Sequence, residues 1–250
     1  MRDSTTDRAV SEVLGYTFVF SIVIASVAIV SIGGIDSFQN ARTAEQIENA
    51  EQAFDVLHDN LADVYLEGAP SRATELSLGD TSLYTGENVS IEIARYRSGG
   101  GWDNTTYLTR PLVQRLDDDR YLIYEMGAVF RTYKDASVVV QEPPILSRSD
   151  RIHYMLPALQ SGAVRSIGST TLLVRGKATN RTVLVSDTDG TYDEFAITID
   201  SPRADLWADD LRDRGFDCSV PGETAECVRD DGPFSSLYVA VHQIKVSLIP

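Results

Sequence analysis

The chain has 250 residues and a formal net charge of −15, from 37 acidic and 22 basic side chains. This length allows one membrane helix and about 200 further residues, enough for one or two small domains with a core. Nucleic acid is excluded as a partner, because binding phosphates requires a basic patch and the sequence has none. Aspartate is abundant and lysine occurs only three times. That balance indicates a halophilic source, where salt screens the repulsion between surface carboxylates.

One stretch near the N-terminus is long and apolar enough to cross a bilayer. Residues 13–35 carry no charge and are bracketed by Glu12 and Asp36. As a helix they would extend roughly 35 Å, more than the hydrocarbon thickness of a membrane. A cleaved secretory signal has a shorter apolar core. Residues 13–35 are therefore predicted to form a transmembrane helix, with residues 1–12 as a leader on the cytoplasmic side.

The charges that flank this span predict its orientation. Arg2 and Arg8 precede it, whereas acidic residues dominate the segment that follows. By the positive-inside rule the N-terminus is cytoplasmic and the bulk of the chain is extracellular. The lipid bilayer is thus the first expected partner of a single-pass cell-membrane protein.

The residues before the span carry a more specific pattern. Residues 8–15, Arg-Ala-Val-Ser-Glu-Val-Leu-Gly, followed by an unbroken apolar helix, resemble the class III signal peptide of haloarchaeal type IV pilins. The resemblance implies that a prepilin peptidase cuts between Ala9 and Val10, in a segment that includes Glu12. It also implies other pilin-like subunits as partners. An uncleaved signal anchor is the alternative.

The helical pattern continues beyond the span through residues 36–68. Apolar residues recur there at spacings of three and four, at Ala44, Ile47, Ala50, Phe54, Leu57, Leu61 and Val64. Gly68-Ala69-Pro70 predicts the end of this amphipathic helix. The stripe favours docking onto the chain's own β domain over an intermolecular coiled coil, because it spans barely three heptads.

From residue 73 to residue 250 the apolar pattern alternates with period two, which is typical of strands. The predicted strands are Thr74–Leu78, Asn88–Arg97, Tyr107–Thr109, Tyr121–Met126, Ala128–Tyr133, Ser137–Gln141, Ile152–Met155, Ser169–Lys177, Arg181–Ser186, Tyr192–Asp200, Ala225–Arg229 and Leu237–Leu248. Short strands with frequent turns predict a mostly antiparallel β-sandwich-like domain, so the fold class is α+β.

Three local features refine this β-rich region. Ser201-Pro202 and Gly215 are predicted to bound one helix, with Leu206, Trp207 and Leu211 on its buried face. The prolines Pro143-Pro144 mark a candidate subdivision near residues 143–150. Residues 121–133, YLIYEMGAVFRTY, predict a hairpin and resemble a segment of an uncharacterised haloarchaeal family, which implies no activity.

Cysteines and glycosylation triplets indicate an exterior location. Cys218 and Cys227 flank a Pro-Gly turn and are predicted to form a disulfide; a metal site would need further ligands that the sequence does not offer. Asn88, Asn104 and Asn180 begin N-X-S/T triplets, and all three follow the span. They are candidate N-glycosylation sites.

The sequence offers little for catalysis. His58, His153 and His242 stand alone, and motifs for nucleophiles, phosphates or dinucleotides are missing. Asp187, Asp189 and Asp193 loosely resemble a calcium loop, but their spacing favours a solvated turn. Trp102, beside a glycine run, favours local packing over contact with a glycan or partner. Neither an enzyme activity nor a metal or cofactor site is predicted.

These patterns together favour a pilin-like, membrane-anchored cell-surface protein, a structural or minor subunit of a type IV pilus-like assembly. The alternative is a monomeric, membrane-tethered binding module or adhesin that does not assemble. An anchored enzyme ranks third, because no site supports it.

Overall fold

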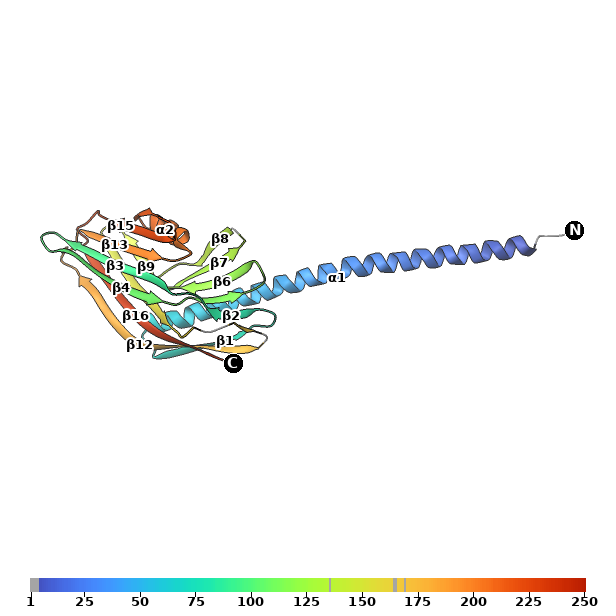
Figure 1. Ribbon diagram of the computed structural model, residues 1–250, viewed down its shortest axis with the longest axis horizontal. Coiled ribbons are helices and arrows are strands. Elements are labelled where there is room, and N and C mark those ends of the chain that lie inside the picture. Colours follow the sequence, from blue (N-terminus) through green and yellow to red (C-terminus); the bar gives the residue numbers. More distant parts are fainter. Residues whose placement is uncertain (1–4, 135, 164–165, 169) are drawn as a thin grey trace. The chain divides into compact units, whose positions relative to one another are not determined.

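A computed structural model describes residues 5–134, 136–163, 166–168 and 170–250; for residues 5–12, 32–40 and 43 it describes only the backbone. The chain divides after Asn49 into two units, and each is considered by itself. The described residues form one long helix followed by sixteen strands, with one short helix between the thirteenth and fourteenth strands (Figure 1).

The long helix, α1, runs from Thr5 to Tyr65 without interruption. It ends close to the predicted stop, because Gly68 adopts a left-handed φ of 76° that lets the chain turn away. Beyond this turn the Ala69 N–H donates to the carbonyl of Asp63 at 3.0 Å, which satisfies one of the last helical carbonyls. The predicted helical continuation past residue 35 is confirmed.

The strands form three sheets. The first sheet has the order β1 (Ser71–Ser77), β12 (Thr171–Asp187), β16 (Ser236–Ile249), β10 (Arg151–Gln160), β9 (Ile145–Arg148). The second sheet has the order β11 (Ile167–Gly168), β2 (Ser82–Thr85), β5 (Leu112–Arg115), β6 (Arg120–Glu125), β7 (Ala128–Tyr133), β8 (Ala136–Gln141). The third sheet has the order β14 (Asp217–Ser219), β15 (Thr224–Arg229), β13 (Glu194–Asp200), β3 (Val89–Arg97), β4 (Gly101–Thr109).

The arrangement of these sheets corrects the expected two-layer sandwich. Three sheets are present, and β10 pairs with β16 in parallel, whereas the other pairs are antiparallel. Side chains alternate with period two in both kinds of pairing, so the sequence does not distinguish them. Strands from both sides of Pro143-Pro144 pair with each other, as β1 does with β12 and β3 with β13.

Individual strands also differ from the prediction. Five short strands, β2, β5, β9, β11 and β14, were not predicted; each has four residues or fewer and depends on its neighbours for pairing. The two strands predicted over 169–177 and 181–186 are one strand, β12, which continues through a register shift between Ala178 and Asn180. Ser169 itself lies outside the described residues.

Two hydrophobic cores hold residues 50–250 together. In the first, which we call the helix core, the last turns of α1 pack against the first and second sheets. In the second, the sheet core, the third sheet and α2 (Ala204–Asp213) pack against the other two sheets. The light-blue end of α1 lies among these strands in Figure 1. Strand β6 serves both cores, because Leu122 and Tyr124 face the helix core whereas Ile123 faces the sheet core. Burial on both faces explains its continuous apolar run.

The short helix α2 is confirmed with a later start. The helix begins at Ala204, with Arg203 at the N-cap position and no side-chain cap bond from Arg203. Ser201, the predicted cap, lies two residues earlier, and its Oγ accepts a hydrogen bond from the Arg203 N–H at 3.1 Å. The buried face includes Trp207 and Leu211 as expected, but Leu206 is only half-buried. Gly215 follows the last turn with a φ of 88°, as predicted for a helix end.

A buried carboxylate ties α2 to the turn between β6 and β7. Glu125 is fully buried, and its Oε1 accepts hydrogen bonds from Ser201 Oγ at 2.8 Å and from Trp207 Nε1 at 2.7 Å. Its Oε2 pairs with the guanidinium of Arg203. Such a pair is stable only while both charges and their hydrogen bonds remain in place.

Replacing Glu125 with glutamine keeps the volume but leaves the largely buried Arg203 charge without its counter-ion. We expect Glu125→Gln to lower the free energy of unfolding by about 3–5 kcal/mol, as for other broken buried pairs. The control is Glu142→Gln, because Glu142 pairs with Arg214 but its side chain is 78% exposed; the expected loss is below about 1 kcal/mol. Guanidinium unfolding of both variants measures the difference, and equal losses would contradict the assignment.

Candidate functional site

The apolar part of α1 is the first component of the candidate site. Val13–Ser31 has a mean hydropathy of 2.4, and none of it is buried in the protein. By length and composition this segment can cross a membrane. Residues 32–35, the end of the predicted span, belong to the stretch for which only the backbone is described.

Hydroxyl groups within this segment are satisfied by the helix itself. Thr17 Oγ1 donates to the carbonyl of Val13 at 2.8 Å, and Ser21 Oγ donates to the carbonyl of Thr17 at 2.8 Å. Ser26 Oγ donates to the carbonyl of Ile22 at 2.7 Å. Because hydrocarbon offers no hydrogen-bond partners, this internal pairing lets the hydroxyls enter lipid at low cost.

The predicted processing residues lie in the first turns of α1. The backbone of Ala9, Val10 and Glu12 is helical, but their side chains are outside the described residues. Cleavage between Ala9 and Val10 therefore stays a prediction.

The other end of α1 is embedded in the helix core. Phe54, Leu57 and Leu61 are each 1% exposed, and they pack with buried residues of the first and second sheets. The backbone of β12 comes so near that a Cβ at Gly176 would lie 2.6 Å from Leu61 Cδ2, so a larger residue there would force the Leu61 side chain to shift. The predicted docking of the stripe onto the chain's own β domain is confirmed from Ala50 onward; Ala44 is exposed.

Polar contacts surround the embedded helix and fix how it is turned about its own axis. Glu51 pairs with Arg131 at 2.6 Å, and Asp63 pairs with Arg72 at 2.8 Å. Asp55 Oδ1 accepts a hydrogen bond from Gln141 at 3.0 Å. Exposed ion pairs contribute little free energy, so the apolar stripe supplies most of the stabilisation of the embedded helix. The surrounding polar contacts set the orientation of the helix.

Shortening one stripe residue tests the embedding. We expect Leu61→Ala to lower the free energy of unfolding by about 2–5 kcal/mol, through lost burial and the cavity left beside Gly176. Leu66→Ala is the matched control on the same stretch, because Leu66 is 53% exposed. Denaturant titration of both variants measures the effect; a loss at Leu61 no larger than at Leu66 would refute the embedding.

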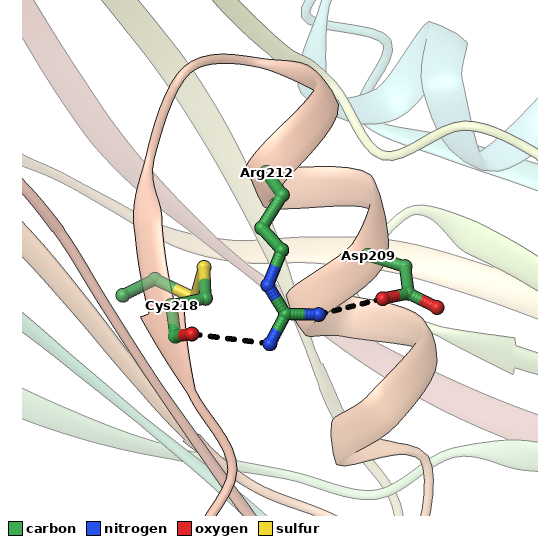
Figure 2. Close-up of a disulfide and its surroundings, with 4 residues drawn as sticks. Asp209, Arg212 and Cys218 are labelled. Carbon is green, nitrogen blue, oxygen red and sulfur yellow. Dashed lines mark hydrogen bonds and ion pairs between the residues drawn. A yellow bond between two sulfur atoms is a disulfide. The ribbon is translucent and has the colours of Figure 1, made fainter.

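The two cysteines form the predicted disulfide. Cys218 on β14 lies directly opposite Cys227 on β15, and the sulfurs are bonded. Arg212 of α2 joins this hairpin to the helix: Nη2 donates to the Cys218 carbonyl at 3.0 Å and Nη1 to Asp209 at 2.7 Å (Figure 2). The disulfide thus closes the edge of the third sheet next to α2.

The three glycosylation triplets lie on separate elements, and their asparagines are all exposed. Asn88 precedes β3, and its Oδ1 accepts a hydrogen bond from Arg110 Nε at 3.0 Å. Asn180 on β12 donates from Nδ2 to Thr182 Oγ1 of its own triplet at 3.3 Å. Asn104 lies on β4. Modification of any of them stays a prediction.

The structure does not bring the isolated titratable residues together. His58 contacts the carbonyl of Gly127, and His153 contacts Ser236. No group of three His, Cys, Asp or Glu side chains suited to a metal occurs among the described residues. The calcium-like loop is a closed turn, because both carboxylate oxygens of Asp187 accept hydrogen bonds from Thr191, at 2.7 and 2.9 Å.

Two surface cavities were not predicted. One, of about 530 Å³, is lined by Tyr84 and Tyr121 of the second sheet together with Asp200, Arg203 and Glu223. The other, of about 400 Å³, lies beside the end of α1. Their walls combine strands far apart in the chain, so no local pattern marks them.

His242 lines the second cavity and is mostly buried. Its ring lies edge-on to Tyr65, with 6.4 Å between the ring centroids. Burial, and then the charge of Arg181, hold the pKa of His242 below its usual range. The ring is therefore neutral in the folded protein at pH values where the unfolded chain already takes up a proton.

This difference makes stability depend on pH. As pH falls below about 6.5, the ordinary pKa of histidine, protons bind the unfolded chain first, so the contribution of neutral His242 to stability is lost. We expect His242→Gln to show a shallower decline of the unfolding free energy between pH 7 and pH 5 than the natural protein. The natural protein measured over the same pH range is the control. An unchanged slope in His242→Gln would contradict the expectation.

Comparison with known proteins matches most of the chain to a family. A family described as a family of unknown function, DUF7289, matches residues 8–247. No curated protein and no solved structure matches the chain. The match covers both the apolar segment and the β-rich region.

Proposed function

The chain belongs to DUF7289, a family of unknown function, and we propose that it serves as a pilin-like, membrane-anchored cell-surface protein. In this role it is a structural or minor subunit of a type IV pilus-like assembly. Its partners are the lipid bilayer, a prepilin peptidase and other pilin-like subunits.

The observation that carries the proposal is the continuity of α1. One helix joins the exposed apolar segment Val13–Ser31 to the stripe that is buried in the helix core. A subunit that moves from membrane to filament needs such a helix, because its apolar segment must leave lipid without detaching from the folded domain. Leaving lipid costs about 25 cal/mol per Å² of apolar surface unless other helices cover the segment again.

Two further features support an exterior β domain. The disulfide between Cys218 and Cys227 is typical of oxidising compartments. The net charge of −15 keeps such a domain soluble in concentrated salt, where the repulsion between carboxylates is screened.

The alternative is a tethered binding module that stays monomeric. The cavity of about 530 Å³ favours it, because Tyr84 and Tyr121 offer aromatic surface beside the charged groups of Asp200, Arg203 and Glu223.

Anchoring and assembly are tested by fractionating cells that produce the full-length chain. We expect the natural protein in membranes and in sheared, sedimentable surface material. Ile24→Arg places a charge in the apolar segment at a cost of about 2.5–3.5 kcal/mol for insertion, so it should deplete both fractions. Ile249→Arg, at an exposed residue of β16, is the matched control and should leave both unchanged.

Two fractionation outcomes bear on the proposals, and mass spectrometry tests processing separately. Protein in membranes but never in sheared material favours the tethered module, and soluble cytosolic protein overturns both. Mass spectrometry of the membrane form tests processing, since a chain that begins at Val10 supports the peptidase and an intact Met1 contradicts it.

A further inference from the structure

Strand β4 forms an open edge of the third sheet. Over Gly101–Thr109 it pairs with β3 in continuous register, without a bulge (Figure 1). The N–H and C=O groups that point away from β3 have no strand partner in the described part of the chain. Such an edge can pair with another chain unless something protects it.

The usual protections are weak on β4. It is the longest of the six outer strands, which otherwise have two to seven residues. It contains neither lysine nor proline, and its one charged residue, Asp103, is paired with Arg95. Trp102 and Leu108 are 51% and 62% exposed. A long, nearly uncharged edge with exposed apolar side chains therefore needs another cover.

An acceptor triplet lies at the centre of this edge. Side chains two apart on a strand share a face, so Trp102, Asn104 and Thr106 all point to the outer face of the sheet. Asn104 is exposed, and its amide has no hydrogen-bond partner among the described residues. Asn88 and Asn180, in contrast, already have hydrogen-bonded amide groups.

The outer face beside Asn104 has the shape of a trough. Across the sheet, Asn104 is followed in register by Ala94, Ala196 and Val228. This row of small side chains is bordered by the aromatic pair of Trp102 and Tyr96, whose ring centroids are 5.5 Å apart. A hollow of about 420 Å³ lies over the same face. Its lining includes Trp102, Ala196, Thr198, Glu226 and Val228.

We propose that Asn104 carries an N-linked glycan whose first sugar packs against Trp102 and lies in this trough, covering the edge of β4. The apolar face of a pyranose ring matches an indole, and its hydroxyls can reach Thr198 and Glu226 at the border of the row. The inference rests on the exterior location in the proposed function, because glycosyl donors act there on folded chains.

The modification is a glycosyl transfer from a lipid-linked sugar phosphate. Asn104 Nδ2 forms a bond to the anomeric carbon of the sugar, and the bond from that carbon to the carrier phosphate oxygen breaks. The phosphate leaves with the electron pair, and the amide nitrogen loses one proton. The glycan then keeps copies of the chain from pairing edge to edge, so that α1 remains the surface for assembly.

Peptide mapping of the full-length protein from membranes of a halophilic, N-glycosylating host tests the site. Trypsin separates the three triplets onto residues 73–95, 98–115 and 178–181, since Pro111 blocks cleavage after Arg110. We expect a glycan on peptide 98–115 in most copies. Asn104→Gln and Thr106→Ala should remove it, whereas Thr105→Ser preserves the triplet and should keep it. An unmodified peptide 98–115 in the natural protein overturns the proposal.

Tryptophan fluorescence tests the packing against Trp102. The only other tryptophan, Trp207, is fully buried, so acrylamide reports chiefly on Trp102. We expect quenching to increase roughly twofold in Asn104→Gln, because the bulky glycan no longer shields the indole. Leu108→Ala, on the same face, keeps the glycan and should leave quenching unchanged. Equal quenching with and without the glycan overturns the stacking.

Light scattering of the purified, detergent-solubilised protein tests the protection of the edge. The glycan-free variants should self-associate more than the natural protein. Equal association of the two overturns the protective role of the glycan, and so does pairing of glycosylated chains through β4. Failure of the glycan can be distinguished from failure of the proposed assembly. An unmodified Asn104 in a protein found in sheared filaments refutes only the glycan, and a glycosylated protein confined to membranes refutes only the assembly.

Discussion

The embedding of α1 between two sheets is the contact on which the rest of the structure depends. Phe54, Leu57 and Leu61 fill the helix core, and the first and second sheets close over them. Gly176 permits this close approach, because a Cβ there would lie 2.6 Å from Leu61 Cδ2 and displace that side chain. Without the helix, the inner faces of both sheets would expose apolar side chains to water.

This contact also determines what the apolar segment Val13–Ser31 is joined to through α1. The same helix contains Val13–Ser31 and the residues buried in the helix core, so no loop separates them in the sequence. A second set of contacts surrounds Glu125. Its bonds to Trp207 and Arg203 join the β6–β7 turn to α2 beside the sheet core. The buried end of α1, the two hydrophobic cores and the disulfide at the edge of the third sheet all lie within residues 50–250.

Local sequence patterns predicted the helices, strands and turns better than they predicted which strands pair with each other. The helix end at Gly68, the hairpin over 121–133 and the Cys218–Cys227 pair were recognisable because each depends on residues close in sequence. The parallel pairing of β10 with β16 was not, since about eighty residues separate the two strands and period-two alternation is the same in either direction. Glu125 gave no signal either, because its partners Ser201, Arg203 and Trp207 lie before and on α2, far along the chain.

Composition and periodicity alone located the apolar segment, the amphipathic stripe and the strand-rich region, because hydrophobic spacing is a local property of the chain. Only folding decided that three sheets form instead of two, that β4 is left as an open edge, and that Asn104, two residues from Trp102, lies on the face that carries the hollow. These features arise from pairings between residues distant in sequence. Their energies depend on which surfaces meet, and a linear pattern does not contain that information.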